Sequence, residues 1–221
     1  MNASRERLAR QLAEAVAEAL RVDLTHQERA LLVVSGGSTP VPFFHALAAI
    51  ELPWERIDVT LADERWVAET ADDSNARLIR EHLLSGAAKA ANFVPLTTAD
   101  ATPEQGVDTV ATRVEQLAWP ASVVVLGMGG DGHTASLFPD SRELGLALST
   151  DESVVAVRTP SQPQARITLS ASRLHQTRRH MLHLNGEDKR AVLATAMAGD
   201  DVRELPIRAF LACPLAIYWA P

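Results

Sequence analysis

Apolar residues recur along the chain in two patterns, one typical of helices and the other typical of buried strands. Apolar side chains stand at every fourth position from Leu8 to Leu20, between charged neighbours, which predicts an amphipathic first helix. Unbroken apolar runs at 30–34 and 123–126 predict strands buried on both faces. Further strands are predicted at 57–61, 93–96, 154–157, 166–170, 180–184 and 215–219, and further helices at about 40–49, 74–84, 102–117 and 187–197.

This alternation of strands with helices is typical of α/β proteins. It predicts a three-layer α/β/α sandwich around a mostly parallel, Rossmann-like sheet. Three closely spaced strands in the second half, at 154–157, 166–170 and 180–184, are candidates for an antiparallel section. The sequence contains no internal repeat, low-complexity tract or evident linker, so a single domain over residues 1–221 is expected.

Composition and charge limit the classes of partner that the chain is expected to bind. A hydrophobic content of 47% excludes a disordered chain, and a net charge of −7 argues against nucleic acid or an anionic membrane. The single cysteine cannot form an internal disulfide. Charged residues near the start are followed by no apolar stretch, and no run is long enough to span a membrane, so a cytoplasmic location without a membrane partner is expected.

The segment most informative about chemistry is the glycine-rich stretch GMGGDGHTASLFP at 127–139, which follows the predicted strand 123–126. Open α/β sheets bind ligands at the carboxyl ends of their strands, and glycines there allow close approach of a ligand. The stretch places Asp131 and His133 at such an end. A neutral imidazole can take a proton from water, and a neighbouring carboxylate can orient it. His133 is therefore the best catalytic candidate among the histidines, against the alternative of a structural histidine in a tight turn.

Candidate phosphate ligands stand at the ends of other strands. The segment SGGSTP at 35–40, containing Gly36, Gly37, Ser38 and Thr39, joins a predicted strand to a helix, which is either an anion-binding turn or an ordinary connection. Arg166 opens a strand after a proline-flanked loop, and Lys189 stands where a strand gives way to a helix. Taken alone, either Arg166 or Lys189 could equally be an ordinary charged residue exposed to solvent. Together they would strengthen a phosphate site.

Two further patterns leave alternatives open. Asp63, Glu64 and Arg65 follow a predicted strand and form either a surface charge cluster or a group that reaches into the cleft. The spacing of glycines at 127, 129 and 132 matches a dinucleotide-binding fingerprint, which is weak evidence by itself. The expected acidic residue does not end the following strand, and two polar side chains interrupt the loop. A nicotinamide cofactor is therefore disfavoured.

The chain resembles the 6-phosphogluconolactonases in five segments that appear in the family's order. They are SGGSTP at 35–40, ADERWV at 62–67, SN at 74–75, GMGGDGHTASLFP at 127–139 and RITLS at 166–170. The wider group includes glucosamine-6-phosphate deaminases, whose resembling segment has a glutamate before its proline as part of an acid–base relay. This chain has Phe138 there, which cannot move a proton, and Arg65 also fits the lactonase pattern better.

The resemblance implies a sugar-phosphate isomerase-like fold and hydrolysis of 6-phospho-D-glucono-1,5-lactone, the second step of the oxidative pentose phosphate pathway, without metal or organic cofactor. We hypothesise that His133 is the general base, that Asp131 orients it, and that Arg65 stabilises the oxyanion with backbone N–H groups of 127–132. The expected substrate- and phosphate-binding residues are Gly36, Gly37, Ser38, Thr39, Asp63, Gly129, Gly130, Arg166 and Lys189. A monomer or weak homo-oligomer is expected. The alternatives are an aminosugar-phosphate deaminase or isomerase, and a non-catalytic sugar-phosphate sensor.

Overall fold

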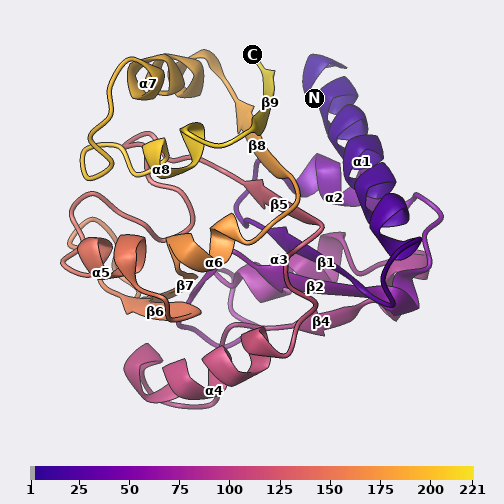
Figure 1. Ribbon diagram of the computed structural model, residues 1–221, viewed down its shortest axis with the longest axis horizontal. Coiled ribbons are helices and arrows are strands. Elements are labelled where there is room, and N and C mark those ends of the chain that lie inside the picture. The colour runs from indigo at the N-terminus through magenta and orange to yellow at the C-terminus, as the bar shows by residue number, and fades with distance from the viewer. Residues whose placement is uncertain (1–2) are drawn as a thin grey trace.

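A computed structural model describes residues 3–221 and shows a central sheet of six parallel strands (Figure 1). Its strand order is β4-β2-β1-β5-β8-β9, and every neighbouring pair is parallel. In chain order these strands are β1 (Ala30–Val34), β2 (Ile57–Leu61), β4 (Asn92–Val94), β5 (Val123–Leu126), β8 (His180–Asn185) and β9 (Leu215–Ala220). The mostly parallel sheet that the apolar runs predict is thus confirmed.

A second sheet of three short antiparallel strands lies beside the first. Its order is β3-β7-β6, formed by β3 (Asp63–Arg65), β7 (Arg166–Leu169) and β6 (Val154–Val157). The predicted antiparallel section is therefore correct for two of its three candidate strands. It is wrong for 180–184, because β8 pairs with β5 in the parallel sheet. Strand β3 was not predicted, since its three residues are all charged and carry no apolar signal.

Ala62 is the point at which the chain passes from one sheet to the other. Its N–H donates to the carbonyl of Val34 in the parallel sheet at 2.9 Å, and its carbonyl accepts from the N–H of Leu169 in the small sheet at 2.9 Å. The residues that follow β2 consequently become a strand of a different sheet. This change of sheet directs the side chains of Asp63 and Arg65 towards the crevice at the end of the central sheet.

Helices cover both faces of the central sheet, as the three-layer arrangement requires (Figure 1). All five residues of β1 are buried, and successive side chains of a strand point to opposite faces, so neither face is open to solvent. None of the helices among residues 3–221 is both long and apolar enough to cross a membrane. The helices are α1 (Ala3–Leu24), α2 (Val41–Ala48), α3 (Asn75–His82), α4 (Pro103–Glu115), α5 (Leu144–Ser149), α6 (Ala171–His175), α7 (Glu187–Met197) and α8 (Arg208–Leu211), with short 3₁₀ turns at Trp54–Arg56 and Gly86–Ala90.

The strand order reverses direction between β1 and β5. From β1 the chain builds outward through β2 and β4, whereas β5, β8 and β9 extend the sheet on the other side. In open α/β sheets such a reversal leaves a crevice at the carboxyl ends of the two strands, because the connections leave in opposite directions. Here the crevice is flanked by the turn that begins at Ser35 and the loop that begins at Gly127, whose N–H donates to Ser35 Oγ at 3.2 Å.

Candidate active site

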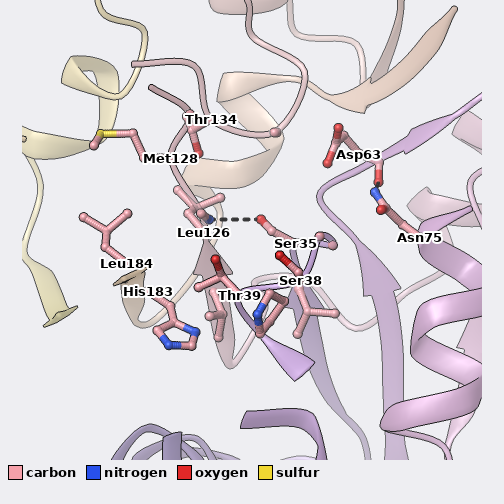
Figure 2. Close-up of a pocket in the computed structure, with 18 of the residues that line it drawn as sticks. Ser35, Ser38, Thr39, Asp63, Asn75, Leu126, Met128, Thr134, His183 and Leu184 are labelled. Atoms are coloured by element: carbon pink, nitrogen blue, oxygen red, sulfur yellow. Dashed lines mark hydrogen bonds between the residues drawn. The ribbon is translucent and has the colours of Figure 1, made fainter. Parts of the chain in front are cut away.

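A pocket of about 390 Å³ opens at the crevice between β1 and β5 (Figure 2). Its volume falls within the range usual for small-ligand sites, about 300–1,000 Å³. Ten of the twelve candidate residues from the sequence line it: Gly36, Gly37, Ser38, Thr39, Asp63, Arg65, Gly129, His133, Arg166 and Lys189. The other two, Gly130 and Asp131, adjoin lining residues: a Cβ at Gly130 would lie 3.9 Å from Lys189 Nζ, and Asp131 contacts His133.

The glycine-rich loop holds a short carboxylate–imidazole pair. His133 Nδ1 lies 2.5 Å from Asp131 Oδ1, which also accepts a hydrogen bond from the His133 backbone N–H at 3.2 Å. Burial by itself raises the pKa of Asp131, but the hydrogen bond and charge of His133 outweigh burial and lower this pKa to about 2. Asp131 therefore stays ionised and fixes the imidazole through Nδ1. The other ring nitrogen, Nε2, is left for proton transfer.

Phe138 supports the imidazole from one side. Its ring centroid lies 4.3 Å from that of His133, and its side chain is only 1% exposed. The guanidinium carbon of Arg166 lies 5.5 Å from the centroid of the Phe138 ring. An apolar ring thus occupies the position that a glutamate fills in the deaminase pattern.

Two arginines enter the pocket from the small sheet. In the antiparallel pairing of β3 with β7, Arg65 lies directly opposite Arg166, so their side chains share one face. Arg65 donates to the Asp73 carbonyl at 2.6 Å, and Arg166 donates to Gln162 Oε1 at 3.0 Å. Burial, together with the charge of Arg65, lowers the pKa of Arg166, although Asp63 at 3.8 Å partly compensates. A second anion in this pocket would relieve the repulsion between the two cations.

Asp63 is a positioned carboxylate. It is 6% exposed and accepts a hydrogen bond from Ser136 Oγ at 2.5 Å. Its backbone carbonyl accepts from Asn75 Nδ2 at 3.0 Å. Asn75 also explains why residue 36 is a glycine, because a Cβ at this position would lie 2.0 Å from Asn75 Oδ1. The carboxylate of Asp63 therefore holds the loop after β5 against the small sheet.

Glu64 points away from the pocket, although it stands between two residues that line it. It is fully buried, and its Oε1 accepts from the N–H groups of Arg65 at 2.7 Å and Asn75 at 2.8 Å. Its Oε2 accepts from the Ala76 N–H at 2.6 Å and from Ser74 Oγ at 3.2 Å. Burial raises the pKa of Glu64, and these backbone N–H groups oppose that rise. The interpretation of residues 63–65 as a surface charge cluster is therefore wrong.

Glu64→Gln is expected to lower the free energy of unfolding by about 3 kcal/mol, because an amide NH₂ would face buried backbone donors that need an acceptor. Urea denaturation of the variant at pH 7 measures this. Glu55→Gln, at an exposed position, is the matched control and is expected to change stability by less than about 0.5 kcal/mol. A loss below about 1 kcal/mol for Glu64→Gln would show that the carboxylate does not organise the start of α3.

The turn between β1 and α2 has the features expected of an anion-binding turn. Gly37 adopts φ +89°, a conformation that favours glycine, and no atom lies within 4 Å of a Cβ built there. Ser38 and Thr39 follow it and line the pocket. On the opposite side of the crevice, burial lowers the pKa of Lys189, while the nearby charge of Asp131 opposes that shift.

Three glycine N–H groups of the loop at 127–132 are already used within the protein. Gly127 donates to Ser35 Oγ at 3.2 Å, Gly129 to the His133 carbonyl at 2.8 Å and Gly132 to the Gly129 carbonyl at 3.2 Å. These bonds shape the loop, so the same groups are not available to bind an oxyanion. The expectation that the N–H groups of 127–132 assist Arg65 is thus wrong for these three.

Several buried polar atoms of the pocket have no hydrogen-bond partner within the described part of the chain. They are Arg65 Nε, Arg166 Nε, Thr134 Oγ1, His183 Nδ1 and Asn185 Oδ1. Leaving a buried polar atom unpaired costs about 1–3 kcal/mol, so their gathering in one pocket indicates a polar ligand. His183 and Asn185 were not predicted. The available signal was the presence of polar residues at the carboxyl end of an otherwise apolar strand.

Similarity to known proteins extends over nearly the whole chain. A family model described as glucosamine-6-phosphate isomerases/6-phosphogluconolactonase matches residues 3–219. A curated 6-phosphogluconolactonase from Pseudomonas aeruginosa is 46% identical over 215 residues, covering 96% of this chain and 90% of the relative. Another from Pseudomonas putida is 44% identical over 219 residues, covering 97% of this chain and 89% of the relative.

A solved structure agrees with these relatives. The crystal structure of a 6-phosphogluconolactonase from Shewanella baltica matches this fold with a TM-score of 0.97 and 44% sequence identity. The match covers 98% of this chain and 94% of that chain. The chain therefore belongs to the glucosamine-6-phosphate isomerase/6-phosphogluconolactonase family.

Proposed function

We propose that the protein hydrolyses 6-phospho-D-glucono-1,5-lactone to 6-phospho-D-gluconate, the second step of the oxidative pentose phosphate pathway. One observation carries this proposal: the oriented imidazole of His133 shares a pocket with Arg65, Arg166 and Lys189. A lactone is an activated ester. Its hydrolysis needs a base for water, positive charge for the developing oxyanion and a grip on the distant phosphate.

Each of these needs has a candidate in the pocket. His133 Nε2 takes a proton from water as the oxygen attacks the lactone carbonyl, and Asp131 stabilises the imidazolium that forms. Arg65, which lines the same pocket, stabilises the tetrahedral oxyanion with its guanidinium. Collapse of that intermediate breaks the bond to the ring oxygen, which receives the proton from the imidazolium. Arg166, Lys189 and the turn containing Ser38 and Thr39 bind the phosphate and thereby hold the carbonyl in place.

Phe138 favours lactone hydrolysis over deamination of an aminosugar phosphate. Ring opening and proton transfer in a deaminase need an acid–base group beside the imidazole. The group found there is an apolar ring 4.3 Å from His133, buried and without an exchangeable proton. Water activation by His133 alone does not need that group.

Stopped-flow measurement of proton release from freshly generated 6-phosphogluconolactone tests the proposed function. The spontaneous rate is subtracted, and the enzyme is expected to add a saturable rate that depends on its concentration. Ammonia release from glucosamine 6-phosphate would instead support a deaminase. Tight binding of 6-phosphogluconate without turnover would support a non-catalytic sensor.

Arg166→Ala is expected to reduce kcat/KM for the phosphorylated lactone by about 10- to 100-fold, because a charge-assisted contact to phosphate contributes about 1.5–3 kcal/mol. The same variant is expected to change hydrolysis of unphosphorylated gluconolactone far less. Steady-state kinetics on both lactones separates the two effects. Arg158→Ala, which removes an exposed arginine outside the pocket, is the matched control. Equal losses on both lactones would contradict a phosphate-binding role for Arg166.

We further propose a cytoplasmic location and a monomeric or weakly associated state. A phosphorylated sugar lactone does not cross a bilayer unaided, which supports the first. The lining residues already supply an oriented imidazole and three cations, so the proposed chemistry needs no group from a second copy, which supports the second. Sedimentation at micromolar concentration tests the oligomeric state.

A further inference from the structure

His183 is a buried histidine of the pocket that the proposed mechanism does not use. It stands on β8, its side chain is almost fully buried at 4% exposure, and it lines the pocket. Its Nδ1 is sealed from solvent and meets no hydrogen-bond partner among residues 3–221. In Figure 2, His183 and Leu184 lie on the opposite side of Ser35 and Ser38 from Asp63 and Asn75. His183 thus belongs to a wall of the pocket distinct from the small-sheet wall.

The His183 ring packs against an aromatic neighbour. The edge of the fully buried Phe43 ring faces it at a centroid distance of 6.2 Å and an interplanar angle of 78°. This contact is apolar and leaves the polar atom Nδ1 without a partner in the described chain. Burial lowers the pKa of His183 to about 4, so the ring is neutral at pH 7. A neutral imidazole has one donor and one acceptor, which suits a hydroxyl group better than a phosphate.

Asn185 extends the same wall. Side chains two residues apart on a strand point to the same face, so Asn185 follows His183 towards the carboxyl end of β8. Its Oδ1 is also buried without a partner in the described chain, and its side chain also lines the pocket. Both residues are neutral, in contrast to the cations at positions 65, 166 and 189. The wall formed by β8 therefore offers hydrogen bonds without charge.

We propose that His183, with Asn185 beside it, binds a hydroxyl group of the sugar chain and so helps to position the lactone and select polyhydroxylated substrates. This inference rests on the proposed function, because it assumes that the pocket holds a sugar phosphate. It explains why an apolar strand end retains two buried polar side chains with unsatisfied atoms. An apolar residue at position 183 would avoid the free-energy cost of a buried polar atom without a hydrogen bond. The contact with a substrate hydroxyl is the advantage that the imidazole offers in return.

His183→Leu tests the inference because it separates a binding role from a structural one. The variant is expected to keep or raise Tm, by up to about 6 °C, since an unsatisfied buried atom is removed. Its kcat/KM for 6-phosphogluconolactone is expected to fall by about 5-fold or more, as loss of one neutral hydrogen bond predicts. His183→Gln retains a donor and an acceptor and is expected to recover part of that loss. Unchanged kcat/KM in His183→Leu would overturn the inference.

His180→Leu is the matched control on the same strand. His180 is also buried, but its Nε2 lies 3.0 Å from the carbonyl of Leu174, and it stands at the end of β8 away from the pocket. Its loss is expected to lower Tm and to leave kcat/KM unchanged. His183→Leu should therefore lose activity without losing stability, whereas His180→Leu should lose stability without losing activity. A lower Tm for both, with no selective effect on catalysis, would make His183 structural.

Competitive inhibition by singly deoxygenated forms of 6-phosphogluconate, one for each secondary hydroxyl, identifies the contact. One of these forms is expected to bind the wild type about 5-fold or more weakly than 6-phosphogluconate, and to suffer no additional loss in His183→Leu. If His183→Leu weakened the binding of every deoxygenated form by the same factor relative to the wild type, the hydroxyl contact would be overturned. If the wild type did not hydrolyse the lactone at all, the proposed function would fail first. Normal hydrolysis with an insensitive His183→Leu would reject only this inference.

Discussion

His133→Ala is expected to lower kcat for 6-phosphogluconolactone by about 100- to 10,000-fold, the usual contribution of a general base. Asp131 does not replace the lost base, because a carboxylate is a weaker base than a neutral imidazole. Affinity for 6-phosphogluconate is expected to persist, since the cations that bind phosphate are untouched. Rapid-mixing kinetics with subtraction of the spontaneous rate, together with calorimetric binding of 6-phosphogluconate, measures both quantities.

His26→Ala controls for the removal of a histidine as such, because His26 is exposed in a turn outside the pocket. The pH profile supplies a further check. The pKa of Asp131 is about 2, so this carboxylate stays ionised throughout the range from pH 5 to pH 9 in which such an enzyme would be assayed. Any decline of wild-type activity on acidification towards pH 5 then reports a group other than Asp131. Full turnover in the variant would remove His133 from its assigned role.

The fold was largely predictable because its strands are buried on both faces. A strand such as β1, covered by helices above and below, requires five consecutive apolar residues and leaves a clear pattern. Strand β3 leaves no such pattern, since Asp63, Glu64 and Arg65 alternate between the pocket and the start of α3. Its pairing with β7 is a tertiary contact that no local pattern specifies.

The residues of the site were predictable to the extent that they stand at the ends of strands. Parallel strands bring their carboxyl ends to one edge of the sheet, so Ser38 and His133 were expected to meet although they are far apart in sequence. The supporting contacts were not predictable. Ser136 bonds Asp63 across the two sheets, and the pairing of β3 with β7 sets Arg65 opposite Arg166. Such contacts depend on how the two sheets meet, and the sequence shows only the residue types.

Gly129→Ala is expected to lower kcat by about 100-fold while leaving affinity for 6-phosphogluconate nearly unchanged, because the change displaces the base and spares the phosphate ligands. A Cβ at position 129 would lie 2.1 Å from His133 Nδ1 and 2.5 Å from Asp131 Oδ1, which is too close for either side chain to stay in place. Phe138 packs against the imidazole, so any displacement of the ring also disturbs this contact.

The displacement would therefore break the 2.5 Å contact that orients the ring, and a shift of about 1 Å at a reacting group costs roughly 100-fold in rate. Gly145→Ala, the same change in α5 outside the pocket, is the matched control and should not reduce kcat, because a Cβ there meets only the end of the Arg203 side chain at 3.4 Å. Comparing kcat and the dissociation constant of 6-phosphogluconate for the two variants gives the result. If Gly129→Ala retained wild-type kcat, the contact between Asp131 and His133 would be dispensable. The glycine would then serve only the shape of the loop.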